Sequence, residues 1–407
     1  MDTSSIYDLK SISLPRLAGG ALRLVASLLE APLTRPLLEG SFLGNAGLPK
    51  IRAYAGEEAP TYLPLYPAPE KNGASAPDLA SIPEAVSSSG FRFRTVRDYA
   101  EAYRSGVTTP LEVAERALEA IEQSDQLSPA MRIFIAVNRE DVLAQARTAT
   151  ERIRAGQAVS IFDGVPVAVK DEVDMTPYPT TVGTKFMGKH PAAQDSTVVA
   201  RMRAAGALLL GKANMHEIGI DTTGRNPHYG TPRNPYNTGH YTGGSSSGPG
   251  AAVGAGLCPV AIGADGGGSI RIPSAFCGVV GLKPTFGRVS EFGAAPLTWS
   301  MGHLGPIAAT VQDAALGYAV LAGADPLDPN THGQPAPILD GYHADDLKGL
   351  TLGVFRPWFE HATPEIVAAC QSVLDGLAAR GATVHEIAIP ELDIARIGQV
   401  DDRDRVH

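Results

Sequence analysis

Residues 258–276, CPVAIGADGGGSIRIPSAF, join an apolar strand to a short helix through three consecutive glycines. Glycine adopts backbone conformations that other residues avoid. Four backbone N–H groups can therefore converge on one point: those of Gly266, Gly267, Gly268 and Ser269. A helix N-terminus adds positive potential there, and converging donors of this kind stabilise a developing oxyanion. The alternative is a tight strand-to-helix turn that needs glycine only for its shape.

Strands and helices alternate on both sides of this stretch. Residues 164–170 and 207–211 read as apolar strands, and residues 196–205 between them read as a helix. Helices are also expected over 95–105, 109–124 and 364–380, and strands over 132–137, 351–355 and 383–389. This alternation predicts an α/β fold with a largely buried sheet between helices.

If Ser269 is a nucleophile, it needs a general base, and Lys170 is the candidate. The apolar strand GVPVAVK ends on this lysine. Burial disfavours the charged form of an amine, and a neutral lysine accepts a proton. The structural alternative is a lysine that simply reaches solvent at the end of a strand.

A second loop rich in glycine and serine, YTGGSSSGPG at residues 241–250, contains the G-x-S-x-G pattern around Ser246. That pattern marks a nucleophile elbow when a strand runs directly into it, whereas the preceding NPYNTGHYTGG is polar and contains proline. Neither loop ends in a Walker motif, and His216-Glu217 lacks the second histidine of H-E-x-x-H. The sequence therefore favours neither nucleotide nor metal chemistry.

Composition narrows the function classes further. The 407 residues are 44% hydrophobic and carry a formal net charge of −9, whereas a nucleic-acid binder normally carries a basic stripe. Cys258, Cys277 and Cys370 show no C-x-x-C spacing, which predicts buried, reduced thiols in a cytoplasmic protein. The N-terminus does not resemble a secretory signal, and no stretch reaches the roughly 18 apolar residues of a membrane-spanning helix.

Two features precede the α/β region. Apolar residues at helical spacing give residues 17–29, from Leu17 to Leu29, one apolar face. This face predicts an ordinary core-facing helix or, as the sharper alternative, contact with a membrane surface or an acyl chain. Residues 60–90 carry repeated prolines followed by SSSG, which predicts an extended strap.

Three motifs in order resemble the amidase signature enzymes: Lys170 in GVPVAVKD, Ser245 in GGSSSG and Ser269 in DGGGSIRIPSAFCGVVGLKPT. Lys170 lies 75 residues before Ser245, and Ser245 lies 24 residues before Ser269, as in the family pattern. The resemblance covers roughly residues 95–395. It implies the amidase signature fold, with a mixed and mostly buried β-sheet sandwiched between helices.

The resemblance also implies roles for individual residues. Ser269 attacks the carbonyl carbon and forms an acyl-enzyme, Ser245 relays the proton after a cis peptide bond, and neutral Lys170 is the ultimate base. The implied oxyanion-hole and substrate-binding groups are those of Gly266, Gly267, Gly268 and Ser245. No metal or other cofactor is implied.

Within the family, the segments VRDYAEAYRSGVTTPLEVAERALEAIE, YTGGSSSG, GADGGGSIRIPSA and LLEAPL resemble the plant-type fatty acid amide hydrolases. This resemblance implies hydrolysis of fatty acyl amides such as N-acylethanolamines, with an N-terminal extension near the acyl-binding channel and the membrane surface. It makes Leu24, Val25 and Leu28 candidates for the channel wall. It also allows peripheral membrane contact and a homodimer.

The implied domains are an N-terminal extension over residues 1–94 and an amidase signature domain over residues 95–407. Two features depart from the family pattern. Pro249 stands where a small residue is usual at the start of a helix, and the sequence ends in the charged DDRDRVH where relatives continue. That ending predicts that the C-terminal part of the domain is missing.

Other functions stay open at this point. They are a carbamate or aryl-amide hydrolase, a glutaminyl-tRNA amidotransferase subunit, and a truncated non-catalytic protein that binds acyl ligands or partners. The amidotransferase reading is disfavoured because the relatives of that enzyme lack the long N-terminal extension.

Overall fold

The structure is a computed structural model that describes residues 19–45, 49, 79, 93–299, 301–335, 337, 346–389 and 392. The chain divides into two compact units. The large unit is Tyr62–Tyr342, and the small unit combines Met1–Thr61 with His343–His407. Apart from Leu79, the predicted strap at residues 60–90 lies outside the described residues, as does Leu17.

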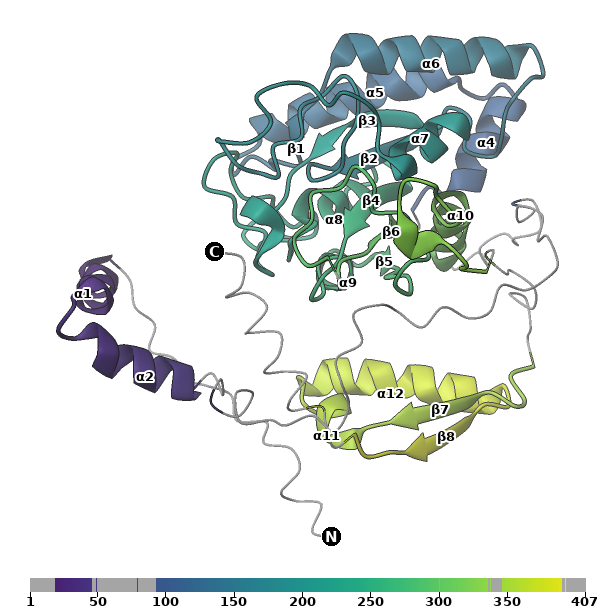
Figure 1. Cartoon of the computed structure of the whole chain (residues 1–407). Helices are drawn as coiled ribbons and strands as arrows, with labels where there is room; N and C mark the ends of the chain where they lie inside the picture. Colours follow the sequence, from purple (N-terminus) through teal and green to yellow (C-terminus); the bar gives the residue numbers. More distant parts are fainter. Residues whose placement is uncertain are drawn as a thin grey trace. The chain divides into compact units, whose positions relative to one another are not determined.

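Figure 1 shows the helices and strands of the large unit. They are α4 (Val96–Arg104), α5 (Pro110–Gln126), β1 (Phe134–Ala136), α6 (Arg139–Arg154), β2 (Pro166–Lys170), α7 (Thr197–Ala204), β3 (Leu208–Ala213), η3 (Glu217–Gly219), α8 (Ser247–Gly254), β4 (Val260–Ala264), α9 (Arg271–Phe276), β5 (Val280–Gly281), β6 (Leu304–Ala308), α10 (Val311–Leu321) and η4 (Pro329–Thr331).

Side-chain caps fix where several helices begin. The hydroxyls of Thr95 and Thr109 each accept a hydrogen bond from the backbone N–H three residues on. The carboxylate of that later residue accepts one from the threonine N–H, so both α4 and α5 start with a capping box. Asn138 caps α6 and Ser196 caps α7 in the simpler way. Pro249 is the third residue of α8, where a backbone N–H has no partner within the helix, so proline is accommodated.

Six strands form one mixed sheet in the order β1-β3-β2-β4-β6-β5. β2 runs parallel to both β3 and β4, whereas β1, β5 and β6 make antiparallel pairs. The predicted α/β fold with a mixed sheet is confirmed. β5 and β6 were not predicted, because β5 has two residues and β6 contains Gly305 and Pro306, which strands disfavour.

Side chains alternate between the two faces of the sheet, and each face has its own apolar core. Val167 and Val169 of β2 belong to one core, to which α4, α7 and α10 contribute. Ala168 belongs to the other core, to which α5, α6 and α8 contribute. The sheet therefore lies between two helical layers (Figure 1), and its central strands are buried on both sides, as is typical of parallel sheets.

The described residues of the small unit form two groups. In one, α1 (Gly19–Glu30) is followed by α2 (Arg35–Asn45), and the Thr34 hydroxyl between them donates to the Leu28 carbonyl. In the other, β7 (Thr351–Val354) pairs in parallel with β8 (Thr383–Glu386), with α11 (Arg356–Phe359) and α12 (Pro364–Ala379) between them in sequence.

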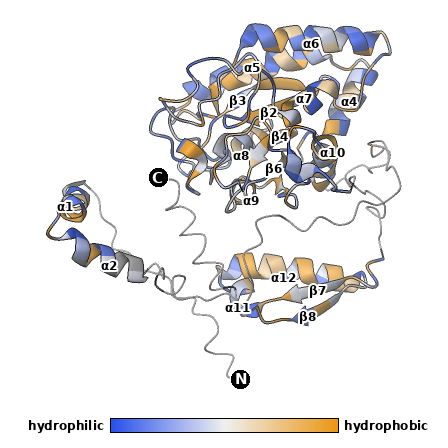
Figure 2. Cartoon of the chain, in the orientation of Figure 1, coloured by the Kyte–Doolittle hydropathy of each residue, from blue (hydrophilic) through white to orange (hydrophobic). Residues whose placement is uncertain are grey.

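One prediction about the cysteines is wrong. Cys258 and Cys277 are buried, but Cys370 is exposed. It lies on α12, none of whose residues is buried, although hydrophobic residues colour much of this helix in Figure 2. Among the described residues, no helix combines the length and the apolar character needed to cross a membrane.

We predict that Gly248→Ala severely destabilises the large unit. A Cβ at Gly248 would lie 2.4 Å from the backbone nitrogen of Asn214 and from the carbonyl oxygen of Ile133. Because both atoms belong to backbone that cannot move aside, we expect a loss of about 3 kcal/mol or more in the free energy of unfolding, measured by urea titration.

Gly376→Ala is the matched control, because Gly376 lies on α12 with no atom within 4 Å of an added Cβ. Alanine there should be neutral or stabilise the helix by up to about 1 kcal/mol. Equal unfolding midpoints for the two variants would contradict the close packing of Gly248 against the Asn214 and Ile133 backbone.

Candidate active site

The site forms where the carboxyl ends of parallel strands meet at one edge of the sheet. Lys170 is the last residue of β2, and Ala264 is the last residue of its parallel neighbour β4. In open α/β sheets, ligands bind outside this edge. Lys170 follows Val169 and therefore shares a face of the sheet with Ala168, which belongs to the core to which α8 contributes.

This orientation brings Lys170 to the loop that precedes α8. Its Nζ donates to Ser245 Oγ at 2.8 Å and to the carbonyl oxygen of Ala264 at 3.3 Å. It also lies 3.3 Å from Glu172 Oε2. Only 1% of the lysine side chain is exposed, so the structure contradicts the alternative of a strand-end lysine in solvent.

Burial lowers the pKa of Lys170 below its ordinary range, although the Glu172 and Asp265 carboxylates act in the opposite direction. Removal from water penalises the ammonium more than the neutral amine. A lysine in this setting can accept a proton from the hydroxyl to which it is hydrogen-bonded.

Ser245 itself is buried and follows a cis peptide bond from Gly244. Its carbonyl accepts a hydrogen bond from the His216 backbone at 3.1 Å. The next residue, Ser246, has a different place: its Oγ donates to the Ala264 carbonyl at 3.1 Å and accepts from the Ala264 N–H at 3.3 Å. Ser246 thus fastens its loop to the end of β4, and nothing in its contacts supports a nucleophile elbow.

Ser269 lies on the neighbouring loop and is largely buried. The Ser246 N–H donates to the Ser269 carbonyl at 3.2 Å, which joins the two glycine-rich loops directly. The structure therefore gathers Lys170, Ser245 and Ser269 from three separate segments around one edge of the sheet.

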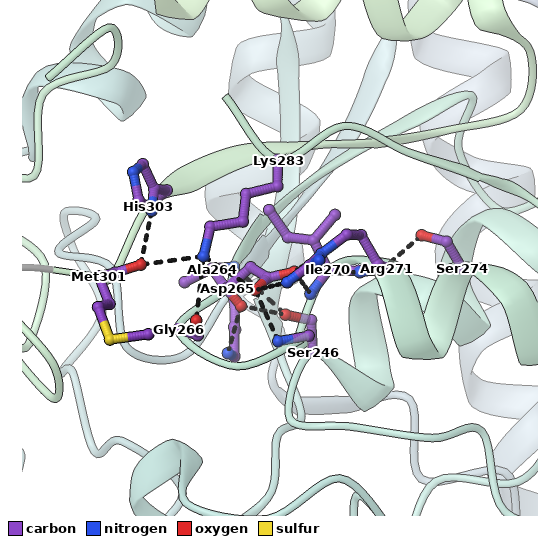
Figure 3. Close-up of polar contacts among 12 residues, drawn as sticks. Ser246, Ala264, Asp265, Gly266, Ile270, Arg271, Ser274, Lys283, Met301 and His303 are labelled. Atoms are coloured by element: carbon purple, nitrogen blue, oxygen red, sulfur yellow. Dashed lines mark hydrogen bonds and ion pairs between the residues drawn. The ribbon is translucent and has the colours of Figure 1, made fainter. Parts of the chain in front are cut away.

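The glycine turn before Ser269 is held by Asp265, which sequence reasoning missed (Figure 3). Its carboxylate accepts hydrogen bonds from the backbone of Gly268 at 2.7 Å and Ile270 at 3.1 Å. The Arg271 guanidinium binds the same carboxylate through two nitrogens, at 2.9 and 3.0 Å. The available sequence signal was an aspartate and an arginine flanking the three glycines.

Burial alone would raise the pKa of Asp265, but the Arg271 hydrogen bonds, the Lys283 charge and the Ile270 N–H together hold it well below its usual range. A carboxylate with several N–H donors stays ionised. Asp265 is therefore a fixed negative charge beneath the turn.

These contacts change the expected set of oxyanion donors. The Gly268 N–H donates to Asp265 at 2.7 Å, so it is engaged inside the turn and is not free to meet a substrate. Across the part of the chain that the structure describes, no acceptor contacts the N–H groups of Gly266, Gly267 or Ser269. The free donors are thus three of the four that the sequence suggested.

A second buried lysine, Lys212, was also missed. The register of β3 against β2 shifts between Val167 and Ala168, which pairs Lys212 with Val169 and turns it toward the opposite face from Lys170. Its Nζ donates to the Val173 carbonyl and lies 3.7 Å from Asp171 Oδ1. Burial lowers the pKa of Lys212 to about 8, with Asp171 acting in the opposite direction. Lys212 thus holds the segment that follows Lys170.

The acyl-channel candidates Leu24, Val25 and Leu28 lie on α1 in the small unit. Leu24 is 61% exposed and Leu28 38% exposed, while Val25 is half-buried. Their part in an acyl channel stays a prediction.

Chemically, the large unit combines a buried amine, a hydroxyl that accepts its hydrogen bond, and a second serine beside free backbone donors. An activated hydroxyl next to convergent N–H groups is the arrangement that acyl transfer requires.

Comparisons with known proteins agree with this chemistry. Residues 112–396 match the Amidase family. The fatty acid amide hydrolase of Oryza sativa subsp. indica is 36% identical over 98% of this chain and 71% of its own length. A glutamyl-tRNA(Gln) amidotransferase subunit of Chloroflexus aggregans is 38% identical over 74% of this chain and 62% of its own length.

Among solved structures, the peptide amidase of Stenotrophomonas maltophilia superposes with a TM-score of 0.69 at 31% identity. The match covers 75% of this chain, and the chain spans 64% of the length of that enzyme. With the family match extending over most of the large unit and into the small one, the chain belongs to the amidase family of amide-hydrolysing enzymes.

Proposed function

We propose that this protein is a serine hydrolase that cleaves carboxylic amides through an acyl-enzyme, with Ser269 as nucleophile, Ser245 as proton relay and Lys170 as base. The observation that carries the proposal is the buried 2.8 Å hydrogen bond between Lys170 Nζ and Ser245 Oγ. A buried amine whose pKa is lowered and whose partner is a hydroxyl is suited to proton transfer.

In the proposed reaction, Ser269 Oγ forms a bond to the carbonyl carbon while its proton passes to Ser245. The Ser245 proton passes in turn to the neutral Lys170 amine. The carbonyl oxygen becomes an oxyanion that accepts hydrogen bonds from the free donors of the glycine turn. The C–N bond then breaks as the proton returns through Ser245 to the leaving amine, and water releases the acyl group by the same route.

A fatty acyl group is the proposed substrate feature. Similarity to the rice fatty acid amide hydrolase extends over 98% of the chain, whereas similarity to the amidotransferase extends over 74%. The N-terminal segment therefore fits the first relative better than the second. Its helix α1 presents Leu24 and Leu28 as exposed apolar side chains, which suit an acyl chain or a membrane surface.

Ser269→Ala should lower amide turnover by at least about 10³-fold while leaving the thermal unfolding midpoint close to that of the parent protein. The change removes the nucleophile and only one small hydroxyl. The measurement is hydrolysis of a fatty acyl amide, together with the intact mass after treatment with a fluorophosphonate probe.

The parent protein should gain one probe adduct, located at Ser269 by peptide mapping, and Ser269→Ala should gain none. Residual turnover within about tenfold of the parent, a barrier change of only about 1.4 kcal/mol, would remove Ser269 from its role and reopen Ser246. A folded parent protein that neither labels nor turns over any amide would instead support a non-catalytic binding protein.

The rate of the parent protein should rise with pH as Lys170 loses its proton. The ammonium form cannot accept a proton, so the base is absent below the lowered pKa of Lys170 and present above it. Lys170→Ala should lower kcat severely and abolish this rise in a pH–rate profile. Lys348→Ala, at an exposed site, is the control; a Lys170→Ala profile that follows the parent's would make the lysine structural only.

The last test of the proposed substrate class replaces Leu24 and Leu28 with serine. Each buried methylene contributes about 0.8 kcal/mol, so loss of several contacts should lower kcat/KM for a long-chain amide by more than about tenfold. A short-chain amide does not reach such a wall and should be hydrolysed as before. Leu33→Ser is the matched control, because Leu33 is 90% exposed.

The ratio of kcat/KM between the two amides decides the outcome. An equal loss on both substrates would mean that α1 only stabilises the fold. An unchanged ratio with full activity would remove the fatty acyl assignment and leave a carbamate or aryl amide as the substrate class to test.

A further inference from the structure

Lys283 is a charged residue of the site region for which the proposed reaction has no role. It follows β5, and its Nζ donates to the carbonyl oxygens of Gly266 and Met301, each at 3.0 Å. The same atom lies 3.4 Å from Asp265 Oδ1, and 19% of the side chain is exposed. Figure 3 shows the Lys283 side chain reaching Met301 and Gly266.

The contact with Gly266 fixes the direction of a neighbouring donor. The peptide bond between Gly266 and Gly267 is trans, so its C=O and N–H groups point in opposite directions within one plane. With the carbonyl bound to Lys283, the Gly267 N–H must point away from the lysine. This N–H contacts no acceptor in the described part of the large unit.

The next N–H group along the turn, that of Gly268, is bound by a carboxylate. The Gly268 N–H donates to Asp265 Oδ1 at 2.7 Å. Lys283 and Asp265, themselves paired, therefore hold the two sides of Gly267, one through a carbonyl and one through an N–H. An ionised partner makes such hydrogen bonds shorter and stronger than neutral ones.

The lysine is anchored in turn by the segment before β6. Met301 O accepts from Lys283 Nζ at 3.0 Å and is 2.6 Å from His303 Nδ1. The Asp265 N–H donates to the His303 carbonyl at 2.9 Å. Lys283 is thus set between two backbone segments, and its ammonium has partners on both.

We propose that Lys283 is a positioning residue for the oxyanion hole: it holds the Gly266–Gly267 peptide so that the Gly267 N–H donates to the oxyanion. The inference rests on the proposed function, because it assumes that an oxyanion forms beside Ser269. A hydrogen bond from an ammonium to the carbonyl also polarises the peptide, which strengthens its N–H as a donor.

The test compares Lys283→Met, which removes the donor and the charge, with Lys283→Arg, which keeps both. Lys348→Met is the control for loss of one lysine at an exposed site. For each variant, kcat and KM are measured on an amide across pH. Hydrogen–deuterium exchange of peptides that contain residues 266–269 is measured by mass spectrometry, which needs no activity.

We expect Lys283→Met to lower kcat by about 10²–10³-fold, the loss typical of one oxyanion donor. KM should stay within about threefold of the parent value, since the contact matters in the transition state. The rise of the rate with pH should persist, because Lys170 is still present. Amide exchange should increase at residues 266–269, and Lys283→Arg should recover most of both losses.

Other results would overturn the inference. One is a Lys283→Met variant whose kcat and local exchange match the parent. Another is increased exchange throughout the large unit that Lys283→Arg does not recover, which would make Lys283 a general stabilising residue. A parent protein without any turnover or probe labelling would defeat the proposed function, and exchange at residues 266–269 would still decide whether Lys283 holds the turn.

Discussion

The large unit keeps the amine of Lys170 out of water, and this is the constraint on which the rest of its structure depends. A buried ammonium is costly, and the cost falls when the group is neutral and hydrogen-bonded. Burial lowers the pKa of Lys170, because β2 is covered on each face by an apolar core, and its Nζ donates a hydrogen bond to the Ser245 hydroxyl. The two helical layers therefore do more than stabilise the sheet, since they also set the proton affinity of its last side chain.

Other charged side chains around this edge of the sheet form ion pairs with one another. On the side of the glycine turn, Asp265 is ionised and is matched by Arg271 and Lys283. On the far face of the sheet, Lys212 pairs with Asp171. Fixed ion pairs thus hold the backbone segments on either side of Lys170. Burial lowers the pKa of Lys170 itself. Rigid ion pairs of this kind preserve the geometry around a buried lysine.

Sequence reasoning succeeded where the signal was local. Capping residues such as Thr95 and Thr109 located helix starts, and apolar runs located β2, β3 and β4, because both patterns depend on neighbours in the chain. It failed for β6, whose Gly305 and Pro306 disfavour a strand, although β6 pairs with both β4 and β5 in the sheet.

The candidate site divides in the same way. Motifs predicted Lys170, Ser245 and Ser269, and their catalytic roles stay a proposal. Asp265 and Lys283 were missed because no motif shows that Asp265 accepts from the Gly268 and Ile270 N–H groups or that Lys283 donates to the Gly266 and Met301 carbonyls. The Gly268 N–H was assigned to the substrate, since nothing in the sequence reveals that Asp265 already accepts it. The bracing of the turn by residues 301–303, which follow Ser269 in the chain, has a consequence for synthesis on the ribosome. A nascent chain that has produced both serines and Lys170 still lacks the Met301 and His303 carbonyls that fix the turn. The proposed nucleophile is therefore synthesised before the backbone carbonyls that brace its turn, and the turn can reach its braced form only after residues 301–303 have been synthesised.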